Sequence, residues 1–435
     1  MSPEAIGGIG FGVVFLLLAF GVRIGFALAL VGFIGIAIIA SMKGALINLA
    51  TSPFSTVANY IFITVPLFLL MGALANAAGI GADAYSVGNK WLGRLPGGLA
   101  MGTIAGCAAF GACSGSSGGA IGVFGLTAFP EMKRYNYADT LAAGCIAAGT
   151  PLAILIPPSM AMIVYGLMSE TSIGALFIAG ILPGVLLSLL FIIGILIWVK
   201  LRPEVGPRGP KTTWHEKLVS LKDVWSVVLL GGLVLGGIWG GVFTPVEAAG
   251  IGSFGAFVIA ISRRRLNKQV LSQALSDTTR LSGMIFVIMI GAIIFNVFLA
   301  LSGLPSMLAE FVQDLPVPRV LILVCVLLFY LIGGCLMDVI GMILLTLPIF
   351  VPIMIGLDYD LILFGVLVTI MSEMAVITPP IGMNVFVLAG ILKDVPMYTI
   401  FRGIIPFIFC EMACIAIIIA FPDIALFLPR TMMGS

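Results

Sequence analysis

The stretch FGACSGSSGGAIG, at residues 110–122, indicates the fold more clearly than any other part of this sequence. It interrupts an apolar segment, residues 98–130, that is too long for one membrane crossing of about 20 residues. Clustered glycines and serines cannot form a continuous helix that faces lipid, because irregular backbone at membrane depth must be buried in protein or line a water-filled cavity. The segment therefore predicts a re-entrant hairpin whose tip lies inside the protein.

The composition places the chain in a membrane. Of its 435 residues, 61% are hydrophobic and only 9% are charged, whereas soluble domains have about 25% charged residues. The net charge of +2 provides no basic surface for a nucleic-acid partner. The seven cysteines have no CxxC spacing, and the single histidine, His215, lies in a polar segment. These features predict an all-α polytopic membrane protein without a cysteine- or histidine-based metal site.

A polar, basic linker at residues 201–223 divides the sequence into two parts, 1–200 and 224–435. Its lysines and arginines predict a cytoplasmic position, because basic loops stay on that side of the membrane. A second interrupted apolar segment, residues 319–352, predicts another re-entrant hairpin. The other apolar runs predict about ten crossings. In this topology the N-terminus and the base of the second hairpin are external, and the base of the first hairpin and the basic segment 263–268 are cytoplasmic.

The two parts repeat one pattern. Gly111 in the first hairpin corresponds to Gly333 in the second. The double proline at 157–158 corresponds, at the same offset, to that at 379–380. Because each part is predicted to cross the membrane an odd number of times, the two copies are inverted relative to each other. Inverted repeats with interrupted helices are typical of secondary transporters; the alternative is a duplication that serves packing alone.

Each hairpin is followed by a second interruption, in the broken helices predicted at 138–165 and 361–388. Prolines there free backbone carbonyls, and the hairpin tips add serine hydroxyls and the carboxylate of Asp338. Such oxygen atoms suit a small cation, while free N–H groups at half-helix ends favour an anion. An intramembrane carboxylate by default marks a functional site. The alternatives are small-residue packing at the first tip and, for Glu373, pairing with a backbone N–H.

Five motifs together resemble the large membrane (M) subunit of TRAP transporters, the tripartite ATP-independent periplasmic transporters. Besides the stretch at 110–122, they are LPGGLA (95–100), ILIPPS (154–159), GGVFTPVEAAGIG (240–252) and ITPPIGMNVFV (377–387). The similarity covers both parts of the chain. Members often carry an acidic residue shortly after the SGSS turn, where this chain has Gly118-Gly119-Ala120-Ile121.

The resemblance implies an elevator-type transporter with sodium bound at each hairpin tip and the substrate between the tips. Carried over by position, one Na⁺ site takes Ser114, Ser116, Gly149 and Thr150. The other Na⁺ site takes Gly334, Met337, Asp338 and Ser372. The substrate is reached by Ser117, Thr378 and Asn384.

The resemblance further implies a sodium-coupled importer of the bacterial inner membrane. A periplasmic substrate-binding protein would deliver a small organic anion, a carboxylate or sulfonate, and a small four-helix membrane (Q) subunit would flank the scaffold in the lipid. The alternatives are a stand-alone sodium/anion symporter of the related superfamily, an anion channel and a membrane enzyme. The enzyme is disfavoured because no nucleophile–base pair stands out in the sequence.

No arginine is expected within the site. Arg134, Arg319 and Arg402 all lie near the ends of predicted helices. The substrate anion is therefore expected to depend on half-helix N-termini and hydroxyl groups.

Overall fold

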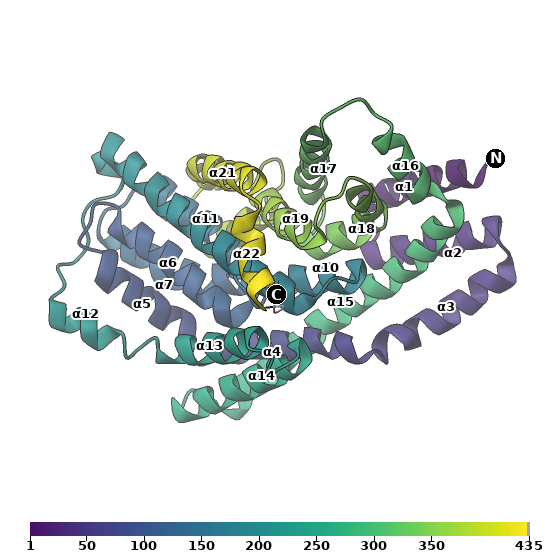
Figure 1. The fold of residues 1–435 in the computed structure, drawn as a ribbon. Helices are drawn as coiled ribbons and strands as arrows, with labels where there is room; N and C mark the ends of the chain where they lie inside the picture. Colours follow the sequence, from purple (N-terminus) through teal and green to yellow (C-terminus); the bar gives the residue numbers. More distant parts are fainter. Residues whose placement is uncertain (433–435) are drawn as a thin grey trace.

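In a computed structural model, which describes residues 1–432, the protein is a bundle of helices with no β-strand in that range (Figure 1). The first part contains α1 (Pro3–Ala19), α2 (Ile24–Ile39), α3 (Met42–Val57), the 3-10 turn η1 (Tyr60–Ile63), α4 (Thr64–Ala77), α5 (Ile80–Leu92), α6 (Gly98–Ser114), α7 (Ser117–Arg134), α8 (Asp139–Gly149), α9 (Leu152–Leu155), α10 (Met160–Ser169) and α11 (Ile173–Leu201). The linker contains η2 (Pro203–Val205) and α12 (Trp214–Ser220). The second part contains α13 (Trp225–Trp239), α14 (Pro245–Ser262), α15 (Lys268–Ser302), α16 (Leu304–Gln313), α17 (Arg319–Gly334), α18 (Val339–Gly356), α19 (Leu361–Ala375), α20 (Met383–Ile391), α21 (Met397–Ala420) and α22 (Asp423–Met432).

Six helices in the described range are long and apolar enough to span a membrane, or eight if each of two bent helix pairs forms one span. The six are η1 with α4, α11, α14, α15, α18 and α21. Helices α1 and α2, which were expected to cross, have 17 and 16 residues and are separated at Gly21, which has a φ of 81°. The prediction of about ten crossings therefore exceeds this count, because several apolar runs turn before they reach about 20 residues.

Both predicted hairpins are pairs of helices joined by a short turn. Helices α6 and α7 form the first, with its turn at residues 115–116, and α17 and α18 form the second, with its turn at residues 335–338. Both continue a little beyond the predicted ends. We call residues 114–117 the first tip and residues 334–338 the second tip.

The predicted broken helices are interrupted where the sequence has its double prolines. The stretch α8–α9 and helix α10 form a pair that is bent by 42° at the break before Met160. Helix α19 ends at Ala375, and residues 376–382 form no helix before α20 begins. Each break leaves backbone N–H and C=O groups without intrahelical partners.

The linker lies against the base of the first hairpin. The N–H of Gly97 donates a hydrogen bond to the carbonyl of Gly206 at 2.8 Å, and the N–H of Gly209 donates to Gly93 at 2.8 Å. In Figure 1, α12 lies beside α5, at the end of the molecule away from α16 and α17. The base of the first hairpin is thus on the same side of the protein as the linker, as the positive charges predict.

Helices α2 and α15 pack closely through glycines. A Cβ atom at Gly291 would lie 2.1 Å from the carbonyl oxygen of Gly25, and one at Gly32 would lie 2.8 Å from the Cα atom of Phe295. In lipid, where apolar surfaces gain little by leaving the solvent, small residues stabilise helix pairs by letting their backbones approach. This contact positions α15, and α15 forms one wall of the cavity described below.

The substitution Gly291→Ala should lower the free energy of unfolding by about 1–3 kcal/mol, because the added methyl group forces α2 and α15 apart. The control is Gly283→Ala on the same helix, where a Cβ atom would meet nothing within 4 Å. The control should be neutral or stabilise the helix by up to about 1 kcal/mol. Thermal unfolding of the detergent-solubilised protein measures both, and equal effects would contradict the glycine contact.

Candidate functional site

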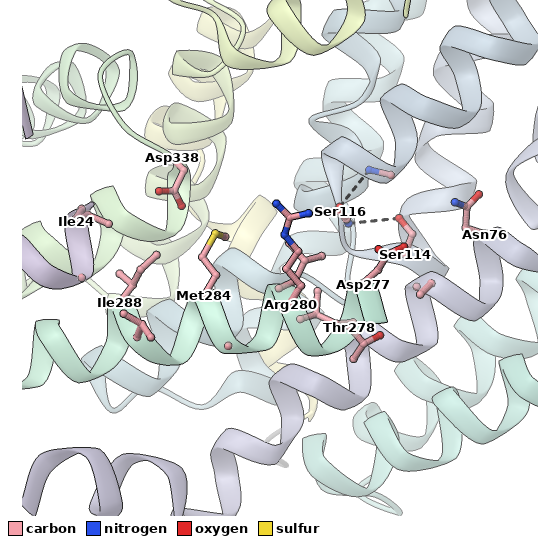
Figure 2. Close-up of a pocket in the computed structure, with 18 of the residues that line it drawn as sticks. Ile24, Asn76, Ser114, Ser116, Asp277, Thr278, Arg280, Met284, Ile288 and Asp338 are labelled. Carbon is pink, nitrogen blue, oxygen red and sulfur yellow. Dashed lines mark hydrogen bonds between the residues drawn. The ribbon is translucent and has the colours of Figure 1, made fainter. Parts of the chain in front are cut away.

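A cavity of about 960 Å³ lies between the two tips and helices α2, α4 and α15 (Figure 2). The tips contribute Ser114, Ser116 and Asp338. The charged and amide side chains from the other walls are Arg23, Asn76, Asp277 and Arg280. Since the two tips come from different parts of the chain, both interrupted hairpins contribute to the lining of one cavity.

The first tip is a tight turn in which two serine hydroxyl groups accept hydrogen bonds from backbone N–H groups. The side-chain oxygen of Ser116 accepts a hydrogen bond from the N–H of Gly119 at 3.3 Å, and that of Ser114 accepts from the N–H of Ser116 at 3.4 Å (Figure 2). Gly115, between the serines, has a φ of 61°, which glycine adopts without steric cost. Ser116 is therefore the N-cap of α7.

The first tip packs directly on the broken helix that follows it. A Cβ atom at Gly115 would lie 2.5 Å from the carbonyl oxygen of Pro158. Gly149 and Thr150 are buried at the end of α8, and the Thr150 hydroxyl donates to the carbonyl of Ala147 at 3.0 Å. Of the four residues predicted for the first sodium site, the two serines line the cavity, and the other two are not among its lining residues.

The second tip has the same construction with a different capping residue. The carboxylate of Asp338 accepts a hydrogen bond from the N–H of Gly341 at 3.2 Å and caps α18. The thiol of Cys335 lies 3.7 Å from the carbonyl oxygen of Ala375 and 3.9 Å from that of Thr378. The second tip thus packs on the non-helical segment that follows α19.

Two polar groups beside the second tip lack partners. The hydroxyl of Ser372 is fully buried, and within the described residues it has no hydrogen-bond partner. The side-chain nitrogen of Asn384 also has none there, although its backbone N–H donates to Val376 at 3.0 Å. Gly334 and Met337 of the second tip are buried, and a Cβ atom at Gly334 would lie 3.8 Å from the carbonyl oxygen of Ser372. Because buried polar groups are usually satisfied, each of these two calls for an explanation such as a bound ligand.

The residues predicted to reach the substrate lie around the tips and outside the cavity lining. Ser117 is the first residue of α7 and is half-buried. The hydroxyl of Thr378 donates to the carbonyl of Met374 at 2.6 Å, within its own segment. Neither these two residues nor Asn384 is among those that line the cavity.

The expectation that no arginine lies in the site region is wrong. Arg23, at the start of α2, and Arg280, within α15, both line the cavity that the tips share. Both arginines are far along the chain from the two hairpins, and their helices approach the tips only in the folded protein. The signal available in the sequence was a charged residue next to a long apolar run.

Two buried carboxyl groups lie on α19 and α21, two helices that pack together. Glu373 of α19 is 2% exposed, and neither of its carboxylate oxygens has a hydrogen-bond partner within residues 1–432. The alternative that it pairs with a backbone N–H is therefore wrong. Glu411 of α21, which the sequence analysis missed, is 1% exposed and lies near enough to Glu373 for the two charges to interact. Intramembrane carboxyl groups without partners are energetically expensive, which makes these two residues candidates for a functional role.

Membrane-spanning helices, interrupted hairpins and a cavity between their tips define a multi-pass membrane transporter. A crystal structure of the YdaH transporter of Alcanivorax borkumensis has the same overall fold, with a TM-score of 0.63 over 94% of this chain and 99% of that chain. At 14% sequence identity, this likeness concerns the fold alone.

Residues 11–424 match the family described as the tripartite ATP-independent periplasmic transporter, DctM component, and the chain belongs to this family. It is 32% identical to the C4-dicarboxylate TRAP transporter large permease protein DctM of Pseudomonas aeruginosa, over 88% of this chain and 89% of the relative. It is 30% identical to the sialic acid TRAP transporter large permease protein SiaM of Vibrio cholerae, over 96% and 97% of the two chains. The protein is thus a transporter permease and not an enzyme.

Substitutions at Asp338 test its role as a cap. Asp338→Ala should lower the free energy of unfolding by about 1 kcal/mol, because the N–H groups at the start of α18 lose their acceptor. Asp338→Asn should leave stability nearly unchanged, since asparagine caps helices as well as aspartate does. Thermal unfolding in detergent distinguishes the two. Equal losses for both variants would show that the charge, rather than the capping oxygen, stabilises the tip.

Proposed function

We propose that this protein is the membrane permease subunit of a sodium-coupled secondary importer in the bacterial inner membrane. It takes a small organic acid, a carboxylate or sulfonate, from a periplasmic substrate-binding protein, and a small four-helix membrane (Q) subunit lies beside it. Family membership supports this assembly, and the two relatives are named for C4-dicarboxylates and sialic acid, which are carboxylates. The observation that carries the proposal is the cavity between two capped tips.

Sodium binds where each tip meets its broken helix. The first site uses Ser114 and Ser116 with Gly149 and Thr150, and the second uses Asp338 and Ser372 with Gly334 and Met337. Hydroxyl, carbonyl and carboxylate oxygens are the ligands that hard cations prefer. The second site is supported by the unpartnered hydroxyl of Ser372 and by the Asp338 carboxylate at the cavity wall.

The substrate binds between the tips, with its negative group toward the N-termini of α7 and α18. Both helices begin at a tip, and a helix N-terminus carries partial positive charge and free N–H groups. Ser117, Thr378 and Asn384 contact the substrate from the tips and the following segments. The unpartnered side-chain nitrogen of Asn384 supports this assignment, because its N–H groups can donate hydrogen bonds to an oxygen of the substrate.

The protein consists of two inverted repeats, and transport proceeds by an elevator movement in which one domain, with segments from both repeats, moves against a scaffold. Helices within 5–79 and 225–301 form most of a fixed scaffold, and residues 92–185 with 315–410 form the moving domain. The packing of α2 on α15 and of α4 on α14 supports one rigid group, and the packing of both tips on their broken helices supports the other. The cavity lies between these two groups, where such a movement would change access to the substrate.

Uptake into proteoliposomes that contain the permease, the small subunit and the binding protein tests the proposal. Labelled succinate, a C4-dicarboxylate, and sialic acid are the probes. Uptake of a probe should require a sodium gradient and no ATP. Uptake that persists when potassium replaces sodium, with the pH gradient collapsed, would contradict sodium coupling.

In the same assay Asp338→Asn should shift the sodium concentration for half-maximal uptake upward by about tenfold, which corresponds to a cation contact of about 1.4 kcal/mol. The amide keeps the cap and one oxygen but removes the charge. The matched control is Asp314→Asn, which changes an exposed aspartate at the end of α16 and should match wild type. An unchanged sodium curve for Asp338→Asn would leave Asp338 with a capping role alone.

The inverted repeat predicts that residues 201–223 and the base of the second hairpin face opposite sides of the membrane. Single cysteines introduced as Lys211→Cys and Asp314→Cys, in a background without the native thiols, occupy exposed positions in these two regions. An impermeant thiol reagent should label Asp314→Cys from outside and Lys211→Cys from inside. Labelling from one side for both would contradict the inverted topology.

A further inference from the structure

Two arginine side chains in the cavity, Arg23 and Arg280, are not used by the tips or by the proposed sodium sites. In Figure 2, Arg280 extends from α15 toward Ser116 of the first tip. Within residues 1–432 neither guanidinium forms an ion pair, since the salt bridges there involve other residues. Both arginines therefore present donors to the cavity that no carboxylate of residues 1–432 binds directly.

The acid nearest to Arg280 on its helix is already engaged. Asp277 lies one turn earlier and lines the same cavity. Its carboxylate accepts a hydrogen bond from the side-chain amide of Gln273 at 2.9 Å. Arg280 is exposed and is the last residue of the polar first part of α15, directly before the apolar run of that helix. An arginine in that position, open to a cavity and without a partner, points to an anionic ligand.

We propose that Arg280 binds the carboxylate or sulfonate group of the transported acid in this cavity, with Arg23 adding a second positive charge. The inference rests on the proposed function, because it assumes that the cavity admits the substrate. A guanidinium group presents a planar fork of donors that matches two oxygens of a carboxylate. It thereby supplies charge and direction that hydroxyls and helix N-termini provide only weakly.

The helix that carries Arg280 determines when this contact forms. Helix α15 is held to α2 by the Gly25–Gly291 contact, whereas the tips belong to the group of helices that is proposed to move. A substrate that travels with the tips therefore meets Arg280 only while the tips face this cavity. Arg280 acts on binding and release at one side of the membrane and does not accompany the substrate.

The cavity lies near the basic segment that precedes α15. Arg263 and Arg265 donate to the carbonyl of Ala78 at 3.3 and 3.2 Å, and Asn76 in the cavity lining is two residues before Ala78. Because this basic segment is predicted to be cytoplasmic, the cavity belongs to the cytoplasmic half of the protein. Arg280 then holds the acid in the state from which it is released into the cell.

Sodium changes the charge balance that the acid encounters. Arg23, Arg280, Asp277 and Asp338 all line the cavity, so its wall carries two positive and two negative side chains. A sodium ion bound at Asp338 leaves a net positive cavity and favours the organic acid. When sodium leaves, the Asp338 carboxylate again opposes the anion. Arg280 thus couples release of the acid to release of sodium.

The test is equilibrium binding to the purified permease, followed as the rise in Tm that ligands produce. Sodium alone is titrated first, and then succinate and sialic acid are titrated at saturating sodium. For the acid that stabilises wild type, Arg280→Gln should raise the concentration for half of the Tm shift by about tenfold or more, because a charged hydrogen bond is lost. Arg280→Lys should be intermediate, since lysine keeps the charge but not the fork.

Lys268→Gln is the matched control, because it removes a positive charge from the exposed first turn of the same helix. Lys268→Gln should bind the acid as wild type does, and Arg280→Gln should keep the sodium-induced rise in Tm. An acid titration of Arg280→Gln equal to that of wild type would overturn the inference and leave the proposed function intact. The absence of any sodium-induced rise in wild type would instead contradict the proposed function, and this inference with it.

Discussion

A helix that ends inside the apolar region of a membrane protein leaves backbone N–H and C=O groups that water cannot satisfy. This constraint determines both tips of the protein. Ser116 and Asp338 supply side-chain oxygens to the first turns of α7 and α18, and the same two residues line the cavity. The side chains that cap the two interrupted helices are therefore also the side chains that a ligand in the cavity would contact.

Glycine contacts then determine how closely the interrupted elements approach one another. A Cβ atom at Gly72 of α4 would lie 2.5 Å from the carbonyl oxygen of Ser114, and one at Gly115 would lie 2.5 Å from that of Pro158. The first tip is thus in contact with α4 on one side and with its broken helix on the other. Small residues at these points permit backbone-to-backbone packing, which in lipid replaces the hydrophobic driving force between helices.

The second part of the chain has more buried polar side chains without hydrogen-bond partners than the first part has near its own tip. Ser372, Glu373 and Asn384 all lie on or next to the broken helix and have side-chain atoms without partners in the described residues, and Glu411 approaches them from α21. In the first part, Thr150 corresponds to Ser372, and its hydroxyl donates a hydrogen bond to the carbonyl of Ala147. Each part of the chain contains a hairpin and an interrupted helix, but the two parts differ in the polar groups they leave without partners.

The sequence by itself determined the two hairpins, the two broken helices and the polar tips, because glycine, proline and serine disturb a helix wherever they occur, whatever the rest of the fold does. It also determined the family, through motifs in both parts of the chain. Only the tertiary structure decided that Arg23 and Arg280 share a cavity with the tips and that Glu411 lies near Glu373. These groupings depend on which helices pack together and at what register, and residues so far apart in the chain carry no local signal of that packing.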